Sequence, residues 1–143
     1  MYEYKCKEIK KIVDGDTLDV VLDLGFNIFH SCRVRMAGID TPESRTRDLD
    51  EKARGKLAKE FLKNWVTEYE NNKKNIVIKT KKEKAKGKFG RVLGELWVEG
   101  VNVNEDMMES YHAVPYSAQN KEEVKKLHLE NRERLIEQGV FKP

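Results

Sequence analysis

The chain has 143 residues, of which 38% are hydrophobic and 37% are charged. A chain of this length can bury one hydrophobic core without disulfides or a structural metal, and its hydrophobic residues occur in nearly every segment, which argues against extended disorder. The 28 basic and 25 acidic residues leave a net charge of only +3, which by itself does not indicate a polyanionic partner. We therefore expect a single domain over residues 1–143.

The first half of the chain predicts three strands and a helix. Ile9, Ile12 and Val13 indicate a first strand, and a turn at Asp14-Gly15 leads to a second strand in which apolar Leu18, Val20 and Leu22 alternate with polar residues. In residues 28–39, Cys32, Val34 and Met36 share one face, whereas Arg33 and Arg35 share the other, outside the core. A polar loop between Pro42 and Asp50 precedes a helix over residues 50–69, where apolar residues recur at helical spacing.

The second half predicts two strands and two helices. Residues 76–78 and 91–98 have the composition of strands joined by a lysine- and glycine-rich hairpin. Asn102, with Glu105 three residues later, is typical of the start of a short helix, and a last helix is expected over 121–138, ending at Gly139. This order of elements favours an α+β fold: a five-stranded Greek-key barrel of the oligonucleotide/oligosaccharide-binding (OB) type with three packed helices.

Two sequence features bear on the compartment and the partners. The first eleven residues lack the apolar run of a secretion signal, and no segment is long enough to span a membrane, so we expect a cytoplasmic protein without a membrane partner. Cys6 and Cys32 are not arranged as a CxxC motif, so small buried side chains are favoured over a disulfide or a zinc site.

The charges are segregated along the chain. Residues 79–91, with the sequence KTKKEKAKGKFGR, are strongly basic, whereas acidic residues gather at 14–23 and 40–51. The basic run is either a solvated hairpin or a surface that contacts a phosphate backbone.

Four acidic residues stand on two short turns, Asp14 and Asp16 on the first and Asp40 and Glu43 on the second. Either turn alone is an ordinary polar turn, because Asp-Gly and Asp-x-Pro are common turn formers. Two strands lie between the turns and can fold back so that the turns meet, which would give a calcium ion the oxygen ligands that it prefers. Arg35 would then add the positive charge that a phosphodiester substrate requires.

The motifs DGDT, R-x-x-x-x-DTPE and KFGR follow one another in this order. In order and spacing they resemble the staphylococcal nuclease, or thermonuclease, family over roughly residues 8–138. The resemblance implies a calcium-dependent nuclease that cleaves DNA and RNA with little sequence preference and leaves a 3′-phosphate and a 5′-hydroxyl.

The resemblance also implies a role for each matching residue. Asp16 and Asp40 would bind calcium through their carboxylates and Thr41 through its backbone carbonyl, and Asp14 would support a bound water. Glu43 would act as the general base. The remaining matching residues would bind the substrate: Arg35 and Arg91 at the scissile phosphate, and Lys88 and Phe89 at the neighbouring phosphate. Phe89 departs from the tyrosine of the family and lacks its hydroxyl donor.

Aromatic residues near the end of the chain could stack on the bases of a substrate. Tyr111, His112 and Tyr116 lie where this family places such residues, and Tyr116 is favoured over Tyr111, although either could pack against the barrel rim instead. His30 and His128 have no partner carboxylate at a recognisable spacing, so structural or surface roles are expected for both.

Two functions remain open on the sequence alone. The first is an active nuclease, and the second is a nucleic-acid-binding module of the same fold that has lost cleavage. The presence of all five principal site residues favours the enzyme: Asp16, Arg35, Asp40, Glu43 and Arg91. We expect a monomer that cleaves single-stranded or frayed DNA, or RNA, with calcium preferred over magnesium.

Overall fold

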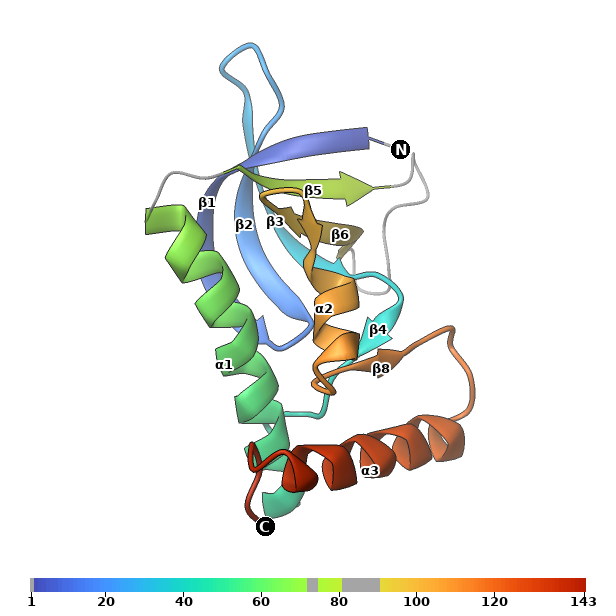
Figure 1. The fold of residues 1–143 in the computed structure, drawn as a ribbon. Helices are drawn as coiled ribbons and strands as arrows, with labels where there is room; N and C mark the ends of the chain where they lie inside the picture. The colour runs from blue at the N-terminus through green and yellow to red at the C-terminus, as the bar shows by residue number, and fades with distance from the viewer. Residues whose placement is uncertain (1, 72–74, 81–90) are drawn as a thin grey trace.

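In the computed structural model, which describes residues 2–71, 75–80 and 91–143, the chain forms a closed five-stranded barrel and three helices (Figure 1). The barrel strands are β1 (Tyr2–Asp14), β2 (Thr17–Asp23), β3 (Phe29–Met36), β5 (Ile76–Thr80) and β6 (Val92–Val98). The helices are α1 (Leu49–Asn71), α2 (Val103–Glu109) and α3 (Lys121–Glu137), and the short strands are β4 (Ile39–Asp40), β7 (Val101–Asn102) and β8 (Val114–Pro115). The expected α+β fold, an OB-type barrel with three helices, is confirmed.

The barrel closes through one parallel pair of strands. The strand order is β3-β2-β1-β5-β6, and β3 also pairs with β6 so that Val34 lies opposite Val92. The other barrel pairs are antiparallel. Three register shifts bend β1, which is longer at its amino end than the sequence predicts, and the bend lets β1 pair with both β2 and β5.

The core lies inside the barrel and beneath α1. Alternate residues of the strands and one face of α1 are buried together, as the sequence patterns predict. The principal members are Leu18, Val20, Leu22, Val34, Met36, Ala58, Leu62 and Val66. Cys6 and Cys32 are half-buried and pack against this core.

Helix α3 crosses the lower end of α1 (Figure 1). Polar side-chain contacts hold it there. Arg132 donates to both carboxylate oxygens of Asp50 at 3.1 and 3.0 Å, and Arg54 donates to the same carboxylate at 2.8 Å. Partial burial would raise the pKa of Asp50, but the hydrogen bonds from Arg54 and Arg132 outweigh it and hold that pKa below its usual value. Asn131 adds a 3.0 Å hydrogen bond to the carbonyl of Ala113.

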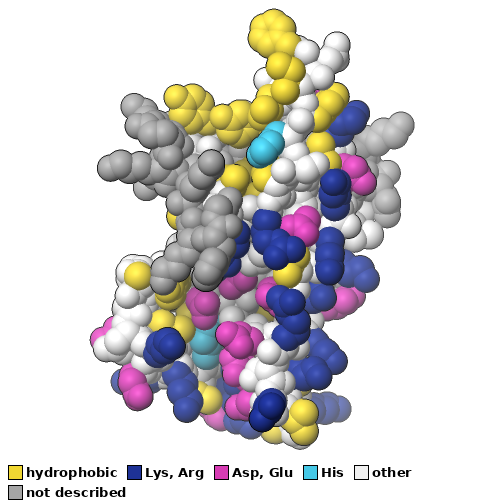
Figure 2. Space-filling model, turned by 180° about the vertical axis from the view of Figure 1, so that it is seen from behind, with side chains coloured by type: hydrophobic (Ala, Val, Ile, Leu, Met, Phe, Trp, Pro, Cys, Tyr) yellow, Lys and Arg dark blue, Asp and Glu magenta, His cyan; other side chains and the backbone are white. Residues whose placement is uncertain are grey.

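The turn between β2 and β3 projects from the opposite end of the barrel and is apolar. Phe26 is 98% exposed, and Leu24, Ile28 and Phe29 are also exposed. Figure 2, which shows the molecule from behind, has hydrophobic side chains at this end and charged side chains of both signs over the lower part of the visible face. Because the register pairs Asp23 with Phe29 near this turn and Thr17 with Arg35 at the far end, the turn is remote from Arg35. In the described residues, no helix is long and apolar enough to cross a membrane.

We expect His112 to make the protein less stable in mild acid. The side chain is buried against Phe61, with ring centroids 4.7 Å apart, rather than facing a substrate. Burial lowers the pKa of His112 below its usual value of 6.5, despite the opposing charge of Asp106. The unfolded chain therefore binds a proton more readily, and the stability present above pH 6.5 falls as the pH drops below it.

Urea unfolding of wild type and His112→Phe between pH 7.5 and 5 would measure this effect, with exposed His30→Phe as the control. His112→Phe should lose less stability than wild type over that interval. An unchanged pH slope would contradict the assignment.

Candidate active site

The two acidic turns meet at Arg35. Its Nη2 atom lies 3.4 Å from Asp16 Oδ2 and 3.4 Å from Asp40 Oδ1, and its Nη1 donates to the carbonyl of Met36 at 2.9 Å. The strands explain this meeting, because Thr17 pairs with Arg35 and Asp40 follows five residues after Arg35. Arg35 lies outside the barrel core, as predicted, yet its side chain is only 13% exposed because the acidic turns enclose it.

Arg33, on the same face of β3, is committed to a different carboxylate. Its Nε and Nη2 donate to Asp19 at 2.8 and 3.1 Å. The hydrogen bond and the charge of Arg33 lower the pKa of Asp19. The two arginines of β3 therefore have different partners, and of the two it is Arg35 that contacts the acidic turns.

Asp16 is held rigidly by its neighbours. It is 8% exposed, and it accepts hydrogen bonds from the Thr17 hydroxyl at 2.9 Å and from the backbone N–H of Thr41 at 3.1 Å. Thr41 is 4% exposed, and its Oγ1 is buried without a hydrogen-bond partner in the described part of the chain. The second acidic turn is thus fastened directly to the carboxylate of the first.

The residues present at this point offer a calcium ion the kind of ligand atoms that it prefers. Two carboxylates already converge on one positively charged nitrogen, and the unpaired Thr41 oxygen is buried beside them. All of these donors are oxygens, which calcium prefers. The described residues contain no cluster of three or more acidic, histidine or cysteine side chains arranged for a metal, so any ion here would need carbonyl, water or substrate oxygens as well.

His128 has a partner carboxylate that no local spacing in the sequence indicates. Its Nε2 lies 2.8 Å from Asp40 Oδ2, and its side chain is 11% exposed. The partners are 88 residues apart in the chain and meet because α3 packs against β8, which pairs with β4, so no local pattern could reveal the pair. His128 thereby fixes one oxygen of Asp40 and leaves the other facing Arg35.

If Asp40 binds calcium, as the resemblance implies, His128→Ala should weaken that binding about tenfold, because residues that orient a ligating carboxylate typically contribute at least this much. His128→Gln should recover part of the loss, since an amide can still donate to Asp40. Isothermal titration with calcium measures this directly. Arg132→Gln is the control, because it loosens α3 without contacting Asp40; an equal loss in that variant would show a general effect of helix docking.

Glu43 is exposed, and hydrogen bonds to Glu51 and to Asp14 hold the loop that carries it. Its backbone N–H donates to Glu51 Oε2 at 3.3 Å. The next residue, Ser44, donates from its hydroxyl to Asp14, which also pairs with Arg45. Asp14 therefore holds the loop that carries Glu43 and does not contact Asp40 in this structure.

The remaining predicted residues fall in different places. Arg91 immediately precedes β6, whose first residue, Val92, lies opposite Val34 of β3. Tyr116 is 40% exposed, and its ring centroid lies 5.9 Å from Arg35 Cζ. Tyr111 is not brought to this point, because it packs against Arg134 of α3 at 5.2 Å. Lys88 and Phe89 lie outside the described residues.

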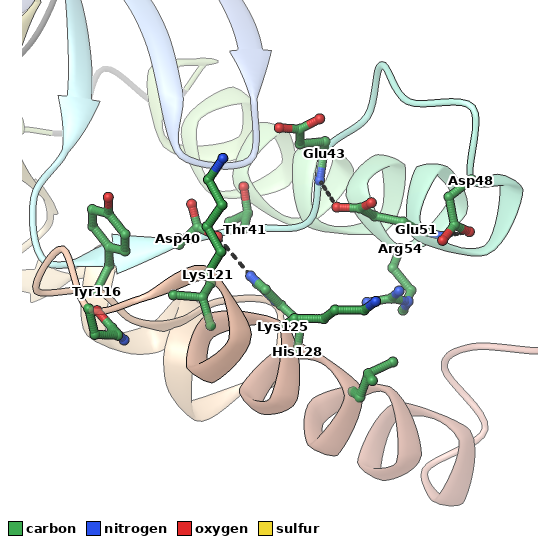
Figure 3. Close-up of a pocket in the computed structure, with 13 residues that line it drawn as sticks. Asp40, Thr41, Glu43, Asp48, Glu51, Arg54, Tyr116, Lys121, Lys125 and His128 are labelled. Atoms are coloured by element: carbon green, nitrogen blue, oxygen red, sulfur yellow. Dashed lines mark hydrogen bonds and ion pairs between the residues drawn. The ribbon is translucent and has the colours of Figure 1, made fainter.

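A cleft of about 630 Å³ opens beside the acidic turns (Figure 3). One wall is the loop of Thr41 and Glu43 with the first turn of α1, and the other wall is α3. Tyr116 and Asp40 line it together with the α3 residues. Asp40 of the second acidic turn, the exposed Glu43 side chain and the exposed Tyr116 ring thus line one cleft.

The sequence of this chain is similar to those of known proteins. The family described as staphylococcal nuclease homologue matches residues 33–137. Protein ParB of Escherichia coli is 33% identical over 64% of this chain and 41% of its own length, and the thermonuclease of Staphylococcus intermedius is 30% identical over 63% and 47%. An uncharacterized protein of Bacillus anthracis is 28% identical over 75% of this chain and 45% of its own length, so the matches span less than half of each of these relatives. The chain belongs to the staphylococcal nuclease homologue family.

Proposed function

We propose that this protein is a calcium-dependent nuclease that hydrolyses phosphodiester bonds of DNA and RNA with little sequence preference and leaves a 3′-phosphate and a 5′-hydroxyl. The observation that carries the proposal is the position of Arg35 between Asp16 and Asp40, next to the cleft into which Glu43 is exposed. A binding module would need a basic groove, but it would have no use for two carboxylates placed at the point where a phosphate must dock.

The electrostatic problem of the reaction explains this arrangement. A phosphodiester is negatively charged and has a poor alkoxide leaving group, so cleavage requires charge neutralisation and an oriented water. A calcium ion held by Asp16, Asp40 and Thr41 would supply positive charge next to a phosphate oxygen. Without such positive charge, the two carboxylates would repel the substrate.

The side chains of this protein supply the other requirements. Arg35, released from the carboxylates when a cation takes its place, can donate two hydrogen bonds from its planar fork to phosphate oxygens and keeps its charge in a partly dry site. Arg91, next to the start of β6, is proposed to act on the same phosphate. Glu43 is exposed on a fastened loop, where its carboxylate can accept a proton from an attacking water. Tyr116 offers a ring on which a neighbouring base can stack.

A time course with an end-labelled DNA oligonucleotide tests the proposal. Cleavage should require calcium, stop with chelator and proceed more slowly with magnesium. The products should carry a terminal phosphate that a 3′-phosphatase removes, which lowers their negative charge. Matched single-stranded and duplex substrates should show faster cleavage of the single strand. If the strand is bound but not cut with calcium, the protein is a binding module; products with a 5′-phosphate would overturn the proposed reaction.

A further inference from the structure

The α3 wall of the cleft carries two lysine side chains that form no ion pair among the described residues. Lys121 and Lys125 both line the cleft and are exposed. Neither has an ion pair within 4.0 Å among the residues that the structure describes. By contrast, Arg132 on the same helix is paired with Asp50 and Glu133.

The position of Lys121 strengthens this observation. It is the first residue of α3, after the cap Asn120, where the helix dipole disfavours a cation and favours an anion. Lys125 follows one turn later, so the two side chains project from the same side of the helix. Figure 3 shows Lys121 and Lys125 extending from α3 on the side that faces Asp40, Glu43 and Glu51.

The cleft is continuous with the candidate site and is suited to a chain of phosphates. In Figure 3, Tyr116 lies on one side of Asp40 and Lys125 on the other. The opposite wall carries Glu43 and Glu51, whose charges repel a phosphate backbone and would direct it toward α3. The volume of about 630 Å³ exceeds what one phosphate needs and falls within the ~300–1,000 Å³ of sites that enclose an organic ligand.

We propose that Lys121 and Lys125 form a phosphate-binding subsite for the part of a single nucleic-acid strand that lies beyond the scissile phosphodiester. The inference rests on the proposed function for the identity of the ligand. Side chains at i and i+4 have Cβ atoms about 5–6 Å apart, which suits neighbouring phosphates of one extended strand. The subsite therefore acts on strands that reach along α3 and has no effect on a ligand that fills only the position at Arg35.

The test compares a long and a short ligand with matched variants. Fluorescence anisotropy with calcium, on proteins that all carry Glu43→Gln so that the strand is not cut, measures the binding of a labelled single-stranded dodecanucleotide and of a labelled dinucleotide. For Lys121→Gln/Lys125→Gln, we expect about tenfold weaker binding of the dodecanucleotide, with the salt dependence (log Kd against log salt) flatter by about 1.4, or ~0.7 per phosphate contact on a single strand. The dinucleotide should bind as it does to wild type.

The control is Lys126→Gln, an exposed lysine on the same helix that does not line this cleft. Its binding of the dodecanucleotide should stay close to that of wild type. Unchanged binding in the double variant, an equal loss for both ligands or an equal loss in the control would each overturn the subsite. Because binding is measured, a wild type that binds the strand without cutting it would refute the proposed function and still test this inference.

Discussion

Arg35→Ala should lower the rate of phosphodiester cleavage at least a hundredfold, by comparison with about 10²–10³-fold for a lost oxyanion donor. The same variant should bind calcium at least as tightly as wild type. The two effects separate because Arg35 now neutralises Asp16 and Asp40, each 3.4 Å from its Nη2, and so competes with a cation for the same oxygens. Removing the guanidinium leaves those carboxylates free for calcium but leaves the phosphate without its donor.

Single-turnover cleavage and calcium titration measure the two effects on the same protein preparation. Arg33→Ala is a matched control, because Arg33 lies on the same face of β3 but pairs with Asp19. That variant should retain the cleavage rate. If Arg35→Ala lost calcium binding in parallel with cleavage, Arg35 would be a structural support of the acidic turns and would not act on the substrate.

Local patterns predicted most of the fold. Alternating apolar residues in β2 and β3 and the apolar stripe of α1 each describe one element facing one core, and one element is all that a local pattern can describe. The cap of α2 was also predictable, since Asn102 accepts a hydrogen bond from the backbone of Glu105 at 3.2 Å, three residues away. The short strands β4, β7 and β8 were not predicted, because two residues are too few to show a period.

The candidate site was predictable as a set of residues and less so as a geometry. The meeting of Asp16, Arg35 and Asp40 follows from strand pairing, which the sequence motifs anticipate. Contacts made by α3 were missed, because the pair of His128 with Asp40 and that of Arg132 with Asp50 join residues 88 and 82 positions apart. Such contacts depend on how a helix docks, and its own composition does not specify its partner.

The support beneath Glu43 was missed for a related reason. A glycine in the middle of a predicted helix costs about 1 kcal/mol relative to alanine, and the sequence gives no hint of why Gly55 is tolerated in α1. In the structure, a Cβ atom at Gly55 would lie 2.5 Å from both the carbonyl carbon and the carbonyl oxygen of Glu43, and 2.7 Å from the nitrogen of Ser44. The glycine allows the backbone of the Glu43 loop to rest directly on the helix.

Gly55→Ala should therefore lower the cleavage rate about a hundredfold while the protein stays folded. The clashing atoms are backbone and cannot rotate away, so the loop must move outward, and a displacement of about 1 Å at a catalytic group can cost this much. The gain in helix propensity of about 1 kcal/mol offsets part of an overpacking cost of about 1–3 kcal/mol, so the free energy of unfolding should change by no more than about 2 kcal/mol. Lys56→Ala, at the adjacent exposed position of α1, is the control for propensity alone.

Denaturant unfolding measures the change in stability, and single-turnover kinetics measures the change in cleavage rate. The loop cannot keep its place above an added methyl group. A Gly55→Ala protein with normal cleavage would therefore show that the position of Glu43 does not limit the rate.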